Sequence, residues 1–542
     1  MNIFSDPGSF PFPPAGKTLL VTRVDSSSPL PRPEGPTPLS VFRGDTRAPR
    51  RLHPLEQALL VVTALHFCFI AWTFGGMTRS PVPEIISLGL AVVGFALALV
   101  NRHYTPEHAR EEEFKLVMWP KLARFPIFWL GLALMLFMAV QGLNPSWKYV
   151  YANQSWRMVP IPHLSWLPTG MDTPMTAGSD IRIWEVMNVW RMMIIYAAPW
   201  LMVCSLWVGI TRRVTLLALL GVLAINGGLL ALVGALQVAA PAAGPPKILW
   251  FMPARSVNFA ASFPYKNHAG AYFNLILATS VALACWYFTR GDRRSGRANP
   301  APLYGLCAVL AGLIVLLSYA RMATILMVVF LAIMLVAGGI WLARSGTDSG
   351  SRAVALVLGL MLLVFIGGGA LFLDNGRAKE RMEALVTTEH KLSIGDRLDA
   401  QKATWDMIQD KWLTGWGAGS FRYYFPVYQQ HYPGIYNYPD GRRRENSRWE
   451  YAHNDYLQIL AELGVVGGGI FVAGFGYWIL KLLRHGAHRR PHLLILLLGL
   501  LLLMANSWTD LPLYCPAVLI AWCALWALTA RWAEFEDNRV RD

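Results

Sequence analysis

The sequence predicts an all-α protein that crosses a membrane many times. Of its 542 residues, 54% are hydrophobic and only 15% are charged, whereas soluble proteins average about 25% charged residues. The apolar residues are gathered into runs of about 20, the length that spans the hydrocarbon core of a bilayer as an α-helix. For the bulk of the chain, this composition excludes disorder, a collagen-like structure and a small disulfide-rich scaffold.

The net charge of +15 would suggest nucleic-acid binding in a soluble domain. Membrane proteins, however, concentrate Lys and Arg in their cytoplasmic loops, so we expect the lipid bilayer and no nucleic acid as a partner. All six cysteines lie in apolar runs and none forms a Cys-x-x-Cys pair. We therefore expect neither a disulfide framework nor a zinc site.

The first 53 residues differ from the rest of the chain. Residues 1–53 are Pro-rich and basic and have no apolar periodicity, which predicts a disordered cytoplasmic tail. They do not resemble a signal peptide, because the apolar core of such a peptide lies within the first ~15–30 residues.

About twelve segments are apolar enough to span a bilayer. We predict transmembrane helices at about 55–75, 82–100, 125–143, 187–210, 214–239, 268–289, 302–319, 323–343, 353–373, 455–480, 492–508 and 511–530. This gives the chain five parts: the tail 1–53, a membrane domain of spans 1–9 (54–373), a large loop (374–454), a membrane domain of spans 10–12 (455–530) and a cytoplasmic C-terminal tail (531–542).

The orientation follows from the basic residues in the short loops. Lys and Arg are more frequent on one side of the predicted arrangement than on the other, and the richer side is expected to be cytoplasmic. Both termini are therefore predicted to be cytoplasmic and the large loop extracytoplasmic. The loop itself does not enter the count, because loops beyond ~60 residues cross largely regardless of charge.

The large loop is predicted to contain amphipathic helices. Apolar side chains recur at helical spacing at Leu398, Trp405, Ile408 and Trp412. This pattern predicts a helix over about 395–412, and a second short helix is expected at 421–430. The aromatic residues of the loop are suited either to stacking on sugar rings or to forming an interfacial belt or the core of the loop.

The segment 452–467 (AHNDYLQILAELGVVG) carries the residue types best suited to chemistry. A histidine such as His453 can accept and donate a proton near neutral pH. Asn454 and Asp455 are residue types that often cap the N-terminus of a helix. For a His-Asn-Asp sequence taken alone, a catalytic role and a capping role both remain open.

This segment resembles the hallmark of the O-antigen ligase and O-antigen polymerase family, in which His-Asn is followed by nine residues and Gly-x-x-Gly. Here nine residues separate Asn454 from Gly464. Three further stretches are similar to the family's motifs: 263–272 (FPYKNHAGAY), 395–398 (GDRL) and 413–421 (LTGWGAGSF). One departure is Ala320, which stands before Arg321 where many members have a hydroxyl residue.

The resemblance implies a membrane glycosyltransferase of the bacterial cytoplasmic (inner) membrane with a periplasmic active site. It would move a glycan from a polyprenyl diphosphate carrier to an acceptor hydroxyl, as an O-antigen ligase or a polysaccharide polymerase. The acceptor remains open between lipid A-core, a growing glycan and protein, the last making the enzyme a protein O-oligosaccharyltransferase. We expect no metal or other cofactor, because the first large outside loop has only scattered carboxylates and no His/Cys cluster has ligand spacing.

A transporter or flippase for lipid-linked glycans is the alternative from a different class. Transporters place polar or charged groups near the middle of the membrane on discontinuous helices. Most of the predicted spans carry no charged residue, and the ionisable residues gather near their outer ends and in the large loop. This distribution favours chemistry at the membrane surface.

Glycan transfer from a diphosphate needs a base for the acceptor hydroxyl and cations for the leaving group. We predict His453 as the base and Arg321 as the catalytic cation. The candidates for binding the diphosphate or the glycan are Lys266, Asn267, Arg191, Arg397 and Asn454. The alternatives are a structural ion pair between Arg191 and Glu185 and a bracing role for Arg397.

Two further polar residues lie near these candidates in the sequence or in the predicted topology. His268 is expected to pack or to form hydrogen bonds rather than to react. Asp510, between the last two spans, is expected to be a solvated carboxylate.

Overall fold

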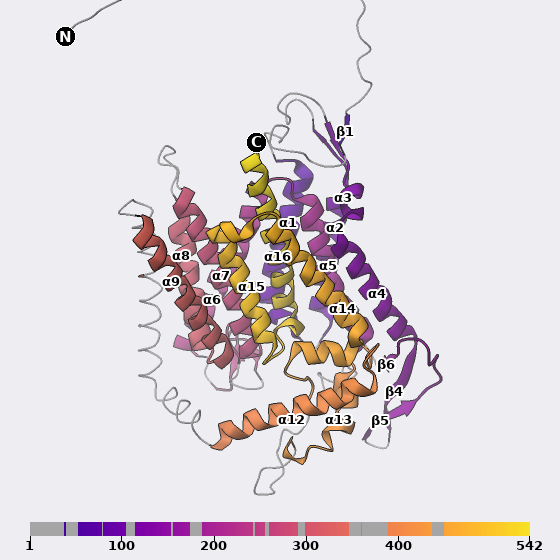
Figure 1. Cartoon of the computed structure of the whole chain (residues 1–542). Helices are drawn as coiled ribbons and strands as arrows, with labels where there is room; N and C mark the ends of the chain where they lie inside the picture. Colours follow the sequence, from indigo (N-terminus) through magenta and orange to yellow (C-terminus); the bar gives the residue numbers. More distant parts are fainter. Residues whose placement is uncertain are drawn as a thin grey trace, which may run out of the picture.

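The computed structural model describes residues 37–39, 52–78, 80–104, 114–152, 155–173, 187–241, 244–254, 259–290, 299–345, 359, 388–435 and 449–541. The protein is mostly helical (Figure 1). Within these residues, 9 helices are long and apolar enough to cross a membrane. The predicted class of a helical polytopic membrane protein is thereby confirmed.

The membrane-spanning helices follow the predicted order. They are α1 (Pro54–Trp72), α2 (Val82–Leu99), α4 (Pro126–Leu143), α5 (Val189–Gly209), α6 (Arg213–Ala239), α7 (Lys266–Arg290), α9 (Arg321–Ser345), α14 (Asp455–Arg484) and α16 (Pro516–Arg541). Two shorter apolar helices, α8 (Ala301–Leu317) and α15 (Pro491–Ser507), occupy two more of the predicted spans. Apart from residue 359, the remaining span, 353–373, lies outside the described residues, so the total of twelve stays a prediction.

Several of these helices have proline at their first or second position, as α1, α2, α4, α8 and α15 show. Proline suits the first turn because its fixed φ is helical and the N–H that it lacks would have no partner within the helix. Most residues of α7 and α16 are buried, whereas most residues of α2, α4 and α9 are at least partly exposed. The bundle is therefore centred on α7 and α16.

The two ends of the bundle differ (Figure 1). One end carries the C-terminus and a small sheet in which β3 (Phe114–Leu116) lies between β1 (Thr37–Leu39) and β2 (Arg102–Tyr104). The other end carries a second sheet, whose strands have the order β5-β4-β6. Its members are β4 (Pro145–Ala152), β5 (Ser155–Pro160) and β6 (Gly170–Asp172). The sequence analysis did not predict these strands, and β1 falls in the tail that was expected to be disordered.

A two-stranded hairpin of β7 (Lys247–Ile248) and β8 (Met252–Pro253) and a five-residue helix, α3 (Trp119–Ala123), complete the connections between the spans. None of them was predicted from the sequence. Their short length explains this, because periodicity is not visible over so few residues.

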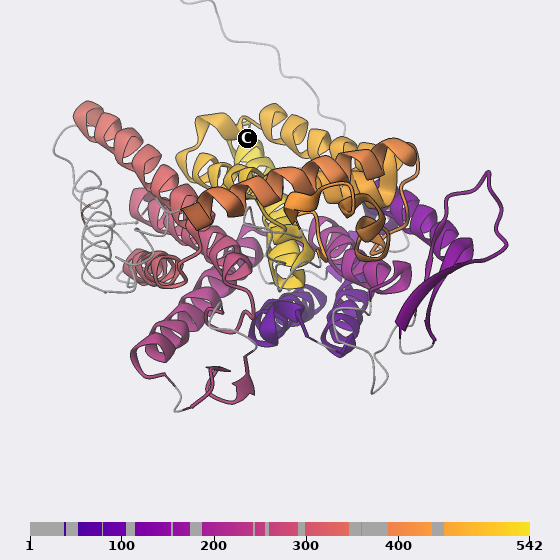
Figure 2. The same ribbon diagram turned by 90° about the horizontal axis from the view of Figure 1, so that it is seen from below.

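The large loop contributes α12 (Thr388–Asp410) and α13 (Phe421–Gln429), in the regions where the sequence predicts helices. Both lie across the end of the bundle that carries β4 to β6 (Figures 1 and 2). Their shared core contains small and aromatic side chains, among them Ala400, Ala403 and Phe425. Of the apolar residues that predicted α12, Ile408 is buried, but Leu398, Trp405 and Trp412 are exposed.

The helix after the loop is kinked. In α14, Gly464 has φ 62° and ψ −168°, which interrupts the helix after its first turns. An added Cβ there would lie 2.4 Å from the carbonyl oxygen of Leu413. The turn after α12 can therefore lie against the kink in α14 only because residue 464 has no side chain. The predicted span 455–480 is thus two helical segments that meet at Gly464.

Candidate active site

His453 and Asn454 lie at the start of α14. The side-chain oxygen of Asn454 accepts hydrogen bonds from the backbone N–H groups of Tyr456 (3.0 Å) and Leu457 (3.2 Å), so Asn454 is the N-cap of the helix. Its side chain is buried. His453 precedes the cap and has a φ of 49°, in the left-handed region that non-glycine residues rarely occupy and that is often found at functional sites.

A buried carboxylate holds the His453 ring. Nδ1 of His453 lies 3.3 Å from Oδ1 of Asp510, in the connection between α15 and α16. Asp510 was expected to be solvated, and this expectation is wrong: its side chain is 4% exposed. It also accepts hydrogen bonds from the Asn267 side chain, the Tyr265 hydroxyl (3.3 Å) and the Leu511 N–H (3.0 Å). The predicted topology places Asp510 in a loop between the last two spans. In the structure, this loop packs against α7, which shields the Asp510 side chain from solvent.

The protonation state of this pair follows from its surroundings. Burial alone would raise the pKa of Asp510, but the hydrogen bond from His453 and the nearby His453, His268 and Arg397 lower that pKa to about 2. Asp510 is therefore ionised at neutral pH, and an ionised carboxylate can only accept hydrogen bonds. Nδ1 of His453 is therefore the donor of the hydrogen bond to Asp510.

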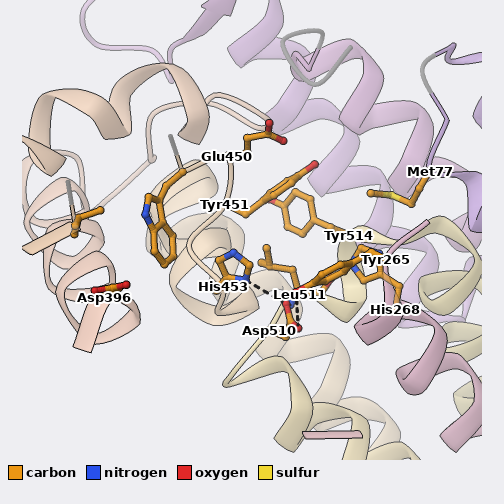
Figure 3. Close-up of a pocket in the computed structure, with 12 residues that line it drawn as sticks. Met77, Tyr265, His268, Asp396, Glu450, Tyr451, His453, Asp510, Leu511 and Tyr514 are labelled. Atoms are coloured by element: carbon orange, nitrogen blue, oxygen red, sulfur yellow. Dashed lines mark hydrogen bonds and ion pairs between the residues drawn. The ribbon is translucent and has the colours of Figure 1, made fainter. Parts of the chain in front are cut away.

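The pair lies in the wall of a cavity of about 450 Å³ (Figure 3), within the range of small-molecule binding sites. Aromatic rings form much of its surface: Trp449 packs edge-on against His453, and Tyr451 packs edge-on against Tyr514. Two further carboxylates reach the cavity, from Asp396 and Glu450. The full lining is Met77, Tyr265, His268, Asp396, Ile435, Trp449, Glu450, Tyr451, His453, Asp510, Leu511 and Tyr514.

Three of the predicted cations lie at the same end of the bundle as this cavity. Arg397 on α12 donates a hydrogen bond from Nη1 to the carbonyl of Thr509 (3.3 Å), next to Asp510. Lys266 is the first residue of α7 and is half-buried, and Arg321 is the first residue of α9 and is exposed. Neither Lys266 nor Arg321 lines the cavity itself.

The start of α9 is held close to α7 by small residues. An added Cβ on Gly270 would lie 2.4 Å from the Cβ of Ala323 and 3.1 Å from that of Ala320. The Asn274 side chain also donates to the carbonyl of Ala323 (2.9 Å). Close approach through small residues is a common way for membrane helices to pack, and here it places Arg321 beside the helix that begins with Lys266.

The sequence of this region matches a known family. Residues 306–472 match the family model described as O-antigen ligase. The chain carries a domain of the O-antigen ligase family. This match covers less than a third of the chain, and it supports a membrane enzyme of the glycan ligase or polymerase type. No curated protein matches the chain.

The O-antigen ligase match contains Arg321, Arg397 and His453 but ends before Asp510. Lys266 also lies outside it. The structure therefore adds residues from helices on both sides of the matched region to the site, because α7 and the connection between α15 and α16 pack against the start of α14.

Arg191 does not join the other candidate site residues. Its guanidinium forms two hydrogen bonds with Glu84, from Nη2 (2.8 Å) and Nε (3.0 Å), and a third with the carbonyl of Thr78 (3.2 Å). Both side chains are buried. This placement favours the structural ion pair, although its partner is Glu84 on α2; Glu185 lies outside the described residues. The pair braces the segment that brings Met77 to the cavity.

The family's glycine motifs meet in a buried network. Glu462 accepts hydrogen bonds from the N–H of Gly419 (2.8 Å) and from the hydroxyl of Tyr514 (2.6 Å). Gly415 and Gly419 have positive φ values of 68° and 74°, so the loop can fold tightly over α14. The Gly-x-x-Gly and Gly-x-Gly-x-Gly motifs are therefore structural here: they hold Tyr514, a residue of the cavity wall.

Sequence reasoning missed Asp510, Tyr265 and Tyr514. One signal was available for Asp510, since the predicted topology already put it on the same side of the membrane as His453. The hydrogen bond from Asn267 to Asp510 also has a counterpart in the sequence, because Asn267 lies in a motif shared with the family. Nothing in the sequence indicated that Tyr265 and Tyr514 lie together.

Proposed function

We propose that the protein transfers a glycan from a polyprenyl diphosphate carrier to an acceptor hydroxyl, with His453 as the general base. The observation that supports this most strongly is the buried Asp510 carboxylate, which orients His453 in the wall of a cavity. A histidine held in this way by a carboxylate is suited to taking a proton from a hydroxyl group.

The proposed step balances without a further reactant. Nε2 of His453 takes the proton of the acceptor hydroxyl while the hydroxyl oxygen forms a bond to the anomeric carbon of the glycan. The bond from that carbon to the phosphate oxygen breaks, and its electron pair leaves with the polyprenyl diphosphate. The Asp510 carboxylate stabilises the imidazolium that forms.

The leaving diphosphate requires positive charge. We propose that Arg397, Lys266 and Arg321 supply it from the rim of the cavity. The N-termini of α7 and α9 point the same way and add the favourable end of the helix dipole. Asn267 is assigned a positioning role, because its side chain is hydrogen-bonded to Asp510, and Asn454 acts as the helix cap.

We propose that this site needs no metal. Among the described residues, no group of three or more His, Cys, Asp or Glu side chains is arranged to hold a metal ion. Transfer should then continue unchanged in excess EDTA. Loss of transfer in EDTA, with recovery on addition of a divalent cation, would contradict this part of the proposal.

The site is assigned to the periplasmic side of the cytoplasmic membrane. The basic residues of the short loops support this orientation. The C-terminus lies at the end of the bundle away from α12 and α13 (Figure 1), as an arrangement with cytoplasmic termini requires. In this arrangement, 374–454 is a periplasmic loop between two membrane domains, 54–373 and 455–530.

Transfer by the purified protein tests the proposal against a flippase. The protein in detergent is mixed with a polyprenyl diphosphate-linked glycan and an acceptor, so that no second compartment exists. We expect a new glycosidic product and free polyprenyl diphosphate. A protein that moves the donor across liposome membranes but forms no product would support the transporter.

The acceptor is identified by deleting the gene and analysing glycans in three fractions: lipopolysaccharide, free polysaccharide and glycoprotein. Loss of the glycan ladder from lipopolysaccharide alone would indicate a ligase for lipid A-core. Shortened chains in every fraction would indicate a polymerase. Loss from glycoprotein alone would indicate a protein O-oligosaccharyltransferase.

A further inference from the structure

Three large apolar side chains on and just after α12 are exposed. Leu398 and Trp405 lie on α12 and Trp412 lies two residues beyond its end; they are 53%, 50% and 57% exposed. Leu398 and Trp405 are seven residues apart and so lie on nearly the same face of the helix, while the opposite face, with Ala400 and Met407, is buried in the loop core. Single exposed apolar residues are common, but several beside the exposed surface of a span indicate a contact surface.

This row of residues ends beside the surface of a membrane span. The N–H of Val465 donates to the carbonyl of Trp412 (2.8 Å), and the N–H of Val466 donates to that of Leu413 (3.1 Å). Leu413, Val465 and Val466 are all exposed. Val465 and Val466 begin the part of α14 that follows the kink, and the exposed apolar residues of a membrane span face lipid. The exposed apolar residues at the end of the row, Trp412 and Leu413, therefore lie beside a lipid-facing surface.

We infer that Leu398, Trp405, Trp412 and Leu413, together termed the α12 stripe, lie in the headgroup region of the extracytoplasmic leaflet. Tryptophan is enriched at this depth because its ring is apolar and its N–H can reach water. The contact with α14 favours lipid over a soluble partner, since a protein bound to the stripe would have to displace lipid from the span.

The lipid contact has a consequence for the site. Arg397 is adjacent to Leu398 and contacts Thr509, the neighbour of Asp510. An α12 fixed at the level of the headgroups holds Arg397 and the rim of the cavity at the depth where the phosphates of a lipid carrier lie. This consequence rests on the proposed function, whereas the lipid contact itself does not.

Fluorescence quenching in a bilayer tests the lipid contact. Leu398→Cys and Trp412→Cys are labelled with an environment-sensitive fluorophore in the full chain, reconstituted in liposomes that contain a lipid with a nitroxide near its headgroup. Gln430→Cys is the matched control, because Gln430 is an exposed polar residue at the end of α13. Unmutated protein, with its six native cysteines, gives the background to subtract.

We expect quenching at positions 398 and 412 to be at least about threefold stronger than at 430. Equal, weak quenching at all three positions would overturn the inference. Weak quenching at 398 and 412 together with energy transfer between labelled copies would show instead that the stripe is covered by a second copy of the chain, and would also overturn it.

A second experiment separates the lipid contact of the α12 stripe from the transferase activity of the proposed active site. Trp405→Glu should weaken quenching at position 398 and lower transfer from a donor embedded in liposomes by about tenfold, while Trp405→Phe should leave both near the wild-type level. Because Trp405 is half exposed, both variants should melt at the wild-type temperature. Strong quenching at 398 in a protein without any transferase activity would refute the proposed function and leave the lipid contact standing.

Discussion

The substitution Asp510→Asn removes the charge that orients His453 and keeps the size of the side chain. An Asn carbonyl can still accept the hydrogen bond from Nδ1, but it cannot stabilise an imidazolium as a carboxylate does. The side-chain amide would also place an N–H₂ group among donors, since Asn267, Tyr265 and the N–H of Leu511 all donate to Asp510. The variant should therefore fold but lose most of its rate.

The size of the loss follows from the geometry. Two unit charges separated by 3.3 Å, the distance from Nδ1 of His453 to Oδ1 of Asp510, attract by at most about 5 kcal/mol at an effective dielectric constant of about 20. A neutral hydrogen bond retains about half the strength of a charged one, so about 2–3 kcal/mol is lost in the transition state. Since about 1.4 kcal/mol corresponds to a factor of ten, kcat should fall about 100-fold.

The assay is transfer by purified protein at saturating donor, with the melting temperature measured on the same samples. Asp399→Asn is the matched control, because Asp399 lies on α12 in an exposed ion pair with Lys402 and should keep the wild-type rate. Asp510→Asn with a kcat within about threefold of wild type, at an equal amount of folded protein, would refute the proposed orientation of His453 by Asp510.

Three other predictions concern the cations, the kink and acid stability. Arg397→Ala should lower kcat/KM for the donor about tenfold or more, while Lys402→Ala on the same helix should not; equal effects would contradict a specific role. Gly464→Ala should lower the free energy of unfolding by at least about 2 kcal/mol and lower the melting temperature. Gly469→Ala, with open space around it, should change neither, and equal melting temperatures of the two variants would contradict the close packing at Gly464. Because the pKa of Asp510 is lowered from 3.8 to about 2, its ionisation contributes about 2 kcal/mol of stability that is present above about pH 4 and is lost toward pH 2. Wild type should therefore lose more stability than Asp510→Asn between pH 5 and pH 3, as a melting series would show.

The helical framework could be predicted because the membrane imposes a strong signal. A span needs about 20 apolar residues whatever it packs against, so α1 and α16 can be located without their neighbours. The short strands β4 and β5 carry no such signal. Their existence depends on pairing between two segments, which a pattern within one segment does not reveal.

The site was predictable in part. Residues that belong to local sequence motifs could be named from the sequence, whereas residues whose role depends on tertiary contacts could not. His453 and Arg397 belong to local motifs and could be named from them. Asp510 could not, because its role depends on burial against α7, a tertiary contact between parts of the chain far apart in sequence. Arg191 shows the opposite case: an arginine at the outer end of a span suggested phosphate binding, but its partner Glu84 lies more than 100 residues away.

The α12 row shows a third limit. Helical spacing of Leu398, Trp405 and Trp412 correctly predicts a helix in this region, but it does not predict which face packs against the rest of the loop. The structure buries the small residues Ala400 and Ala403 instead, because they allow α13 to approach closely. Periodicity identifies an amphipathic helix, and it does not say whether protein or lipid covers the apolar face.

The most direct test of the central claim is a comparison of purified wild type and His453→Ala in one transfer assay. The products are the new glycosidic bond, measured by mass spectrometry, and the released polyprenyl diphosphate. The proposed mechanism predicts that wild type forms both in equal amounts and that His453→Ala, at the same melting temperature, forms neither above background. Transfer by His453→Ala at a rate near that of wild type would contradict the assignment of His453 as the base.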